Sequence, residues 1–395
     1  MTATKLMKSH LMAAATLLVT LVGGCARLPT ADPGDPVPPA TDPPGVNPEP
    51  PLPPPADVGA CVAITGVTVI DVTAGPARPD STVLIRDDRI AAVGLAAQTP
   101  VPAGATVIDG RGKFLIPGLW DMHAHLADPG LLPLFIRYGV TGVRQMFAIG
   151  PVYRPPLGLA APPAPDGPRV VGANQALDGP DTRFGVLLRG NVLTADGPDA
   201  ARARVLRDRG NGCVKVFSRL PRAAYFAAVD EAKACGLPVV GHVPQEVSAA
   251  EASDAGQTTI EHLEQVAIGC SDREDRLMIE LRLSTGPAGK AEDASGWRVQ
   301  LQAHLCYDAG KAEALFRRFA ANRTWHVPTL VQTRSVARLA DADAVDPALV
   351  PELPAAVRLA WRRVVADGGV KLPYAGLQYS RADLAERAEL YRCEA

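Results

Sequence analysis

The sequence predicts an α/β fold: an incomplete (β/α)8 barrel of the TIM type, preceded by a small N-terminal β-sandwich domain. Two patterns support this prediction. Before Pro117, short β-forming runs follow one another with turn residues between them, as in a small sheet. After Pro117, apolar β runs alternate with stretches of helical spacing, which favours parallel strands joined by helices. We therefore expect the small domain at residues 58–116 and the barrel at residues 117–395.

The first 25 residues are typical of an export signal. Lys5 and Lys8 precede an apolar run at residues 11–22 that is too short for a permanent membrane anchor. The box Leu-Val-Gly-Gly-Cys at residues 21–25 resembles a bacterial lipoprotein signal. That resemblance implies lipidation of Cys25 and a protein held on a membrane by this N-terminal lipid anchor, in the periplasm or at the outer membrane. A conventional signal peptide with a coincidental cysteine is the alternative.

A proline-rich linker is expected next, at residues 26–57. It contains thirteen prolines, so it cannot bury enough apolar surface to fold by itself. The small domain then begins with β runs at residues 62–70, 82–86, 90–93 and 105–108. Asp87-Asp88-Arg89 is expected to join the second and third runs as a hairpin.

Composition narrows the choice of partners. The chain has 395 residues, is 47% hydrophobic and carries a formal net charge of −2, so no nucleic-acid partner is indicated. We expect a small-molecule substrate, and homo-oligomer formation stays open. Six cysteines follow Cys25 without a CxxC pair. We expect a disulfide between Cys270 and Cys306, and two unpaired buried thiols are the alternative.

Seven apolar β runs are the expected strands of the barrel: residues 119–123, 140–144, 169–172, 213–217, 238–242, 258–262 and 325–330. Residues 222–235 are an expected helix between them, with apolar positions near every third or fourth residue and Gly236 as its stop. An eighth strand is not evident. In such a barrel the reactive groups lie at the carboxyl ends of the strands.

Five side chains suited to metal chemistry lie at or near these strand ends. His123 and His125 point to the same side because side chains alternate along a strand. Lys215 lies in the fourth run, and His242 and His262 end the fifth and sixth. Each of these residues alone has an ordinary structural explanation, but together and in this order they predict one site.

At this point the residues resemble the amidohydrolase superfamily, in its imidazolonepropionase-like and dipeptidase-like branch. The most specific phrase is Leu-Ile-Pro-Gly-Leu-Trp-Asp-Met-His-Ala-His at residues 115–125. Supporting phrases lie at residues 139–144, 214–218, 236–242 and 259–264, and the resemblance runs from about residue 63 to residue 330.

The resemblance implies a site for two divalent metal ions, with Zn²⁺ expected. His123 and His125 would bind the more buried ion, His242 and His262 the more exposed one. Lys215 would bridge them as a carbamate formed with carbon dioxide, which needs a neutral amine. Lys215 and His262 are also the expected catalytic residues, and His326 is an expected substrate contact. Metal-bound water would attack the scissile carbonyl.

The sequence also departs from the family pattern. The family places an Asp at the end of strand eight in a Gly-Thr-Asp phrase, and this sequence has no such phrase, although Asp367 is the nearest substitute. We therefore expect a truncated or frame-shifted member. Gln145 stands where relatives often carry Asp, and His304 is expected on a helix surface.

The function expected from the resemblance is hydrolysis of a carbon–nitrogen bond, in an amide or cyclic amide, of a small molecule. A dipeptidase acting on Xaa-basic or Xaa-Pro dipeptides is an alternative within the same class, and lactone or organophosphate hydrolysis stays open. A catalytically inactive remnant that lacks the strand-eight Asp is the alternative from another class.

Overall fold

The computed structural model describes residues 61–337, except 73–74, 127, 149–156, 158–162, 164–165, 183–190, 208, 211 and 285–292, and then residues 350–355, 371–372, 377–378 and 389. The expected signal and linker, and Asp367, lie outside the described residues. Within the described part no helix has the length and apolar character needed to cross a membrane. The chain divides into two compact units at Gly118–Leu119, and each is described by itself.

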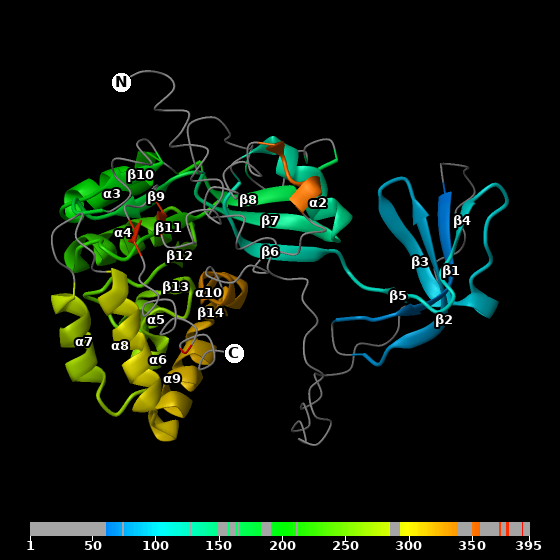
Figure 1. Ribbon diagram of the computed structural model, residues 1–395. Helices are drawn as coiled ribbons and strands as arrows, with labels where there is room; N and C mark the ends of the chain where they lie inside the picture. Colours follow the sequence, from blue (N-terminus) through cyan, green and yellow to red (C-terminus); the bar gives the residue numbers. More distant parts are fainter. Residues whose placement is uncertain are drawn as a thin grey trace. The chain divides into compact units, whose positions relative to one another are not determined.

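The first unit is a five-stranded sheet (Figure 1). Its strands are β1 (Cys61–Val69), β2 (Arg78–Arg86), β3 (Arg89–Leu95), β4 (Thr106–Asp109) and β5 (Phe114–Leu115). The order is β3-β2-β1-β4, with β5 also on β1; β2 and β3 form the expected antiparallel hairpin, and β4 runs parallel to β1. Because the described strands form one sheet, the second layer of the expected sandwich stays a prediction.

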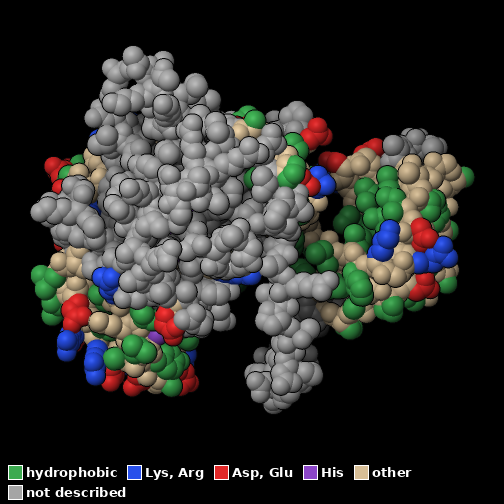
Figure 2. Space-filling model, viewed as in Figure 1, with side chains coloured by type: hydrophobic (Ala, Val, Ile, Leu, Met, Phe, Trp, Pro, Cys, Tyr) green, Lys and Arg blue, Asp and Glu red, His purple; other side chains and the backbone are tan. Residues whose placement is uncertain are grey.

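The core of this unit is small. Ala63, Val67 and Val83 are buried between its strands, whereas Ile90 and Phe114 are each 69% exposed. Figure 2 shows apolar side chains on the surface of this unit. The unit therefore buries only part of its apolar surface through its own described strands.

Parallel strands form the second unit, in two sheets. One sheet contains β6 (Leu119–Ala124), β7 (Val140–Met146) and β8 (Arg169–Ala173). The other has the order β10-β9-β11-β12-β13-β14, with bounds β9 (Ala176–Asp178), β10 (Val192–Thr194), β11 (Val214–Val216), β12 (Val239–Gly241), β13 (Gln257–Glu261) and β14 (Trp325–Val327). The Gly212 amide, just before β11, donates to the carbonyl of Gly172 on β8 at 2.9 Å, which joins the two sheets.

All seven expected strands of this unit are present, so the prediction of parallel strands alternating with helices is confirmed. β9 and β10 were not expected. In the described part of the chain β6 and β14 are edge strands, so a closed barrel stays a prediction.

Helices connect the strands of the second unit (Figure 1). Their bounds are α2 (Leu132–Arg137), α3 (Pro198–Arg207), α4 (Arg222–Ala234), α5 (Ala249–Ala255), α6 (Val266–Gly269), α7 (Glu274–Leu283), α8 (Asp293–Leu305), α9 (Ala309–Asn322) and α10 (Leu330–Ala337). Short 3₁₀ turns lie at η2 (Ala96–Gln98) in the first unit, and at η3 (Pro129–Leu131) and η4 (Val350–Glu352) in the second. Near the end of the chain, β15 (Lys371–Leu372) pairs with β16 (Leu377–Gln378).

The main core lies between the strands and the helices of the second unit. Val216 on β11 and Ile260 on β13 are fully buried there, and Tyr225 of α4 packs in the same cluster. Side chains that neighbour these along a strand, such as Lys215 and Glu261, therefore point to the opposite side of the sheet. This alternation separates an apolar face under the helices from the opposite face, which carries Lys215 and Glu261.

The expected disulfide between Cys270 and Cys306 is wrong, since both thiols are free. Ser271 and Tyr307 form an isolated antiparallel bridge. In an antiparallel pair the two segments run in opposite directions, so the residue before one bridge partner and the residue before the other lie on opposite sides of the bridge. Cys270 and Cys306 occupy those two positions, so this pairing separates them.

Candidate metal centre

His123 lies on β6 and His125 follows the last residue of that strand, with both rings on the same side. The backbone amide of His123 donates to Oδ1 of Asp121 at 2.9 Å, which stabilises the end of the strand. The Nε2 atoms of the two histidines are 3.2 Å apart, and the ring centroids are 5.1 Å apart. The alternation of a β-strand thus brings two imidazole nitrogens to one point.

His242 and His262 join this pair from two other strands. His242 follows β12 and His262 follows β13. The ring of His262 is 4.6 Å from that of His123 and 4.9 Å from that of His242, measured between centroids. Four histidines from three separate strand ends therefore form one continuous cluster.

Each of the four rings uses Nδ1 for a contact with an oxygen outside the cluster. These contacts are His123 with Oε2 of Glu261 at 2.7 Å, His125 with the carbonyl of Phe147 at 3.1 Å, His242 with Oγ of Ser218 at 2.6 Å, and His262 with Oγ1 of Thr329 at 2.6 Å. Carbonyl and carboxylate oxygens only accept, so Nδ1 of His123 and of His125 carries the proton. In the neutral ring this leaves a lone pair on Nε2, which can bind a metal ion.

Burial favours the neutral form of these rings. It lowers the pKa of His125 to about 3 and holds the pKa values of His123 and His262 well below their ordinary value, and the charge of Lys215 adds to the effect. Neutral imidazole is the form that ligates metals. Near pH 7 these three rings are therefore prepared to donate electron pairs rather than protons.

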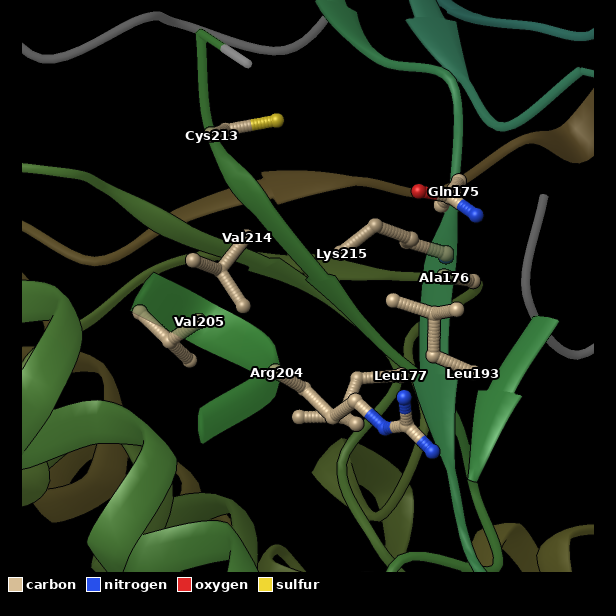
Figure 3. A pocket seen from close by; sticks show the side chains of 9 residues that line it. All are labelled: Gln175, Ala176, Leu177, Leu193, Arg204, Val205, Cys213, Val214 and Lys215. Atoms are coloured by element: carbon tan, nitrogen blue, oxygen red, sulfur yellow. The ribbon is translucent and has the colours of Figure 1, made fainter. Parts of the chain in front are cut away.

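Lys215 lies in the middle of β11 and is 1% exposed. Its Nζ has no hydrogen-bond partner among the described residues and lies 5.0 Å from the centroid of the Phe217 ring. Burial lowers the pKa of this amine. Figure 3 shows its side chain extending toward Gln175 and Ala176, along a pocket also lined by Arg204 and Cys213. A buried amine without a partner is unusual and requires an explanation.

Two other histidines from the sequence lie elsewhere. His326, the expected substrate contact, pairs in register with Ile260 of the apolar face, and its ring packs on Phe319 of α9 at 4.6 Å between centroids. The structure does not bring His326 to the four-histidine cluster, so its contact with substrate stays a prediction. His304 lies on α8 and is half-buried.

Several residues around the cluster were not expected from the sequence. Glu261, fully buried, contacts His123, and Arg144 contacts Glu261 at 2.7 Å. Glu264 lies 3.0 Å from Nδ1 of His242, and burial raises the pKa of this carboxyl. The sequence feature that could have indicated Arg144 and Glu261 is an ionisable residue directly after an apolar one near the end of an expected strand, as in Val143-Arg144 and Ile260-Glu261.

Gln145, at the position where relatives often carry Asp, has a structural role here. It is fully buried, and its Oε1 accepts from the backbone amide of Leu126 at 2.8 Å. This bond ties β7 to the segment that follows His125. An uncharged amide at this position therefore holds the loop after β6.

In the described part of the chain, no three or more His, Cys, Asp or Glu side chains form a group that could hold a metal ion. His123 and His125 are the pair whose donor atoms already meet. Two nitrogens bound to one tetrahedral zinc ion at ordinary bond lengths would be about 3.3 Å apart, and this pair matches that separation.

Comparisons with known proteins give short but clear similarities. No family model matches the chain. The chain is 46% identical over 67 residues to a dihydroorotase of Pelotomaculum thermopropionicum, and 39% identical over 70 residues to an adenine deaminase of Rubrobacter xylanophilus. It is 47% identical over 51 residues to an imidazolonepropionase of Idiomarina loihiensis. These alignments cover 17%, 18% and 13% of this chain but only 15%, 12% and 12% of the respective relatives.

A solved structure resembles the chain over a longer stretch. The bottromycin amidohydrolase has a TM-score of 0.53 and 21% identity, over 85% of this chain and 65% of that chain. At this level of identity the likeness shows a shared fold. The mixed α/β arrangement with parallel strands is therefore that of an amidohydrolase neighbour.

Proposed function

This chain belongs to the amidohydrolase superfamily, and we propose from that premise that it is a metal-dependent hydrolase. The reaction would cleave a carbon–nitrogen bond, in an amide or cyclic amide, of a small molecule by means of a metal-activated water. The curated relatives act on carbon–nitrogen bonds, which supports the choice of reaction. They match only short segments, so the activity of the whole protein is a proposal.

The observation that carries the proposal is the approach of Nε2 of His123 to Nε2 of His125 at 3.2 Å. Both rings hold their proton on Nδ1, because each Nδ1 faces an oxygen that only accepts. Two lone pairs at this distance repel each other and cannot form a hydrogen bond. A cation between them would turn this repulsion into attraction, so the pair favours a metal ion.

We assign the metal-binding residues as the resemblance does. His123 and His125 would hold one divalent ion, with zinc expected, and His242 and His262 the other; His262 would also serve catalysis. Lys215 would join the two as a carbamate made with carbon dioxide. Its buried amine, which has no hydrogen-bond partner within the described part of the chain, supports this role. When bound, such ions lower the pKa of water and polarise a carbonyl. The protein's part is to exclude solvent and to hold the donors in the neutral form.

A fold of (β/α)8 type with a β-sandwich at residues 58–116 fits this function, and both belong to the proposal.

Export also belongs to the proposal. Lipidation at Cys25 would hold the enzyme at a membrane in the periplasm or outer membrane. Growth of producing cells with labelled palmitate tests this part. Label should enter the full chain and be lost in Cys25→Ser, whereas equal label in both would contradict the anchor.

The test of the hydrolase is the metal content of the full chain, purified from cells grown with zinc and bicarbonate. About two ions per monodisperse chain are expected. A screen of cyclic amides, amides and Xaa-Pro or Xaa-basic dipeptides then selects between the main proposal and the dipeptidase alternative. Bound metal without turnover of any of these would favour an inactive remnant, and protein without metal would contradict the proposed centre.

A further inference from the structure

Glu261 is a buried carboxylate whose two oxygens are both engaged. It ends β13, directly before His262, and its side chain is 0% exposed. Oε1 accepts from Nη2 of Arg144 at 2.7 Å and from Oγ1 of Thr259 at 2.6 Å, while Oε2 lies 2.7 Å from Nδ1 of His123. A buried charge persists in a protein only when it is paired and hydrogen-bonded, so this arrangement requires all its partners.

Arg144 accounts for the charge of Glu261. Its side chain is 7% exposed, and the guanidinium is anchored by two further contacts, Nε to the carbonyl of Met122 at 2.8 Å and Nη1 to Oγ1 of Thr259 at 3.2 Å. Arginine stays charged in proteins, which keeps Glu261 in the carboxylate form. The ion pair thereby leaves Oε2 as a fixed acceptor that faces His123.

That acceptor decides which nitrogen of His123 carries the proton. A carboxylate cannot donate, so the bond to Oε2 is made only when the proton is on Nδ1. Nε2 of His123 is then an electron-pair donor, and it faces Nε2 of His125. A neutral acceptor could make the same bond, but it would not need Arg144 and would hold the ring less strongly.

We propose that Glu261 is a positioning residue for the metal centre: held as a carboxylate by Arg144, it fixes His123 with the proton on Nδ1 and Nε2 free for metal. This inference rests on the proposed function. It adds a residue that touches neither the substrate nor the metal, and it links β6, β7 and β13 through one buried charge.

The first test reads the proton directly. The full chain is labelled with ¹⁵N-histidine, stripped of metal with a chelator and studied by long-range ¹H–¹⁵N correlation, with His123→Asn to assign the signal. The spectrum should show His123 protonated on Nδ1. A His123 ring protonated on Nε2 would overturn the inference, whether or not the protein binds metal.

The second test uses two variants matched in charge. Both remove the ion pair: Arg144→Met with Glu261→Gln keeps an oxygen that can accept from His123, whereas Arg144→Met with Glu261→Leu does not. Cobalt(II) binding is followed by its visible absorption spectrum, which reports nitrogen ligation. The leucine variant should bind Co²⁺ about 10- to 100-fold more weakly than the glutamine variant. Equal affinity in two folded variants would overturn the inference.

The two tests separate this inference from the proposed function. If the wild-type chain binds no Co²⁺, the proposed metal centre fails, and the proton position in His123 still decides the role of Glu261. If the wild type binds Co²⁺ but His123 carries its proton on Nε2, the metal centre stands and the role of Glu261 is wrong. The spectrum of the wild type also decides the matter if the double variants fail to fold.

Discussion

A Cβ atom placed on Gly241 would lie 2.7 Å from Cδ of Lys215. Gly241 ends β12, beside the strand that carries Lys215, and it has φ of +120°, which L side chains rarely adopt. The carbonyl of Val216 approaches the same point even more closely. The absence of a side chain at residue 241 is thus what leaves room for the buried lysine beside the histidine cluster.

Gly241→Ala should therefore destabilise the fold and disturb the lysine together. Backbone strain and the clash should cost about 2 to 4 kcal/mol of unfolding free energy. Urea unfolding measures this cost, and elemental analysis shows whether metal is lost. Gly210→Ala is the control, because nothing lies within 4 Å of a Cβ at that position. Equal stability of the two variants would show that β11 and β12 are not packed in this way.

The five proposed ligands should differ from other basic residues in their effect on metal content. Lys215→Ala and His242→Ala should lower the bound metal per chain, because each removes a donor from the cluster. His304→Ala, a change on α8 at a histidine outside the cluster, should leave the metal content unchanged. Elemental analysis of the three proteins purified alike provides the comparison. Equal retention of metal would contradict the assigned site.

Tyr225→Phe should weaken the second unit. The buried Tyr225 hydroxyl donates to Oε1 of Gln257 at 2.8 Å, and Nε2 of Gln257 donates to the carbonyls of Gly241 and Thr259 at 3.1 and 3.0 Å. Phenylalanine would leave a buried amide oxygen without its donor, at a cost of about 1 to 3 kcal/mol. Tyr307→Phe, at a residue 59% exposed, is the control and should change urea unfolding little. Similar losses in both would argue against the buried bond.

Asp178 should make stability depend on pH. Burial raises the pKa of this carboxyl to about 6, above its ordinary 3.8, although Oδ1 accepts from the backbone amide of Arg219 at 2.9 Å. The folded state thus binds the proton more tightly than the unfolded state. The stability that this group contributes is complete below pH 3.8 and is lost as the pH rises through about 6.

The measurement is urea unfolding of metal-free wild type and Asp178→Asn between pH 4 and 7.5. The wild type should lose about 2.5 kcal/mol more than the variant over this range. The whole shift of about two pKa units corresponds to about 3 kcal/mol, but the unfolded carboxyl is already partly ionised at pH 4. All other groups are common to both proteins. Parallel stability curves would mean that Asp178 ionises in the folded state as easily as in the unfolded state.

Local patterns were enough for much of the fold. Seven strands of the second unit and the helix α4 follow from apolar period and stop signals, which depend on neighbours in sequence. β9 and β10 were not expected, because three residues are too few to show a period. β11 and β12 are equally short but lie within longer apolar runs, at residues 213–217 and 238–242, which made them recognisable. The Cys270–Cys306 disulfide was expected only because the two cysteines lie on either side of a polar, Gly-containing stretch. The register of the Ser271–Tyr307 bridge keeps them apart, and both thiols are free.

The sequence by itself indicated the resemblance to amidohydrolases and the members of the histidine cluster, because His-x-His on a strand and histidines at strand ends follow from the period of two and from parallel order. Only the tertiary structure decided what holds those rings. Glu261 meets His123 across 138 residues, and His326 turns to the helix side with Ile260. Such contacts depend on register between strands distant in sequence, which no local pattern encodes.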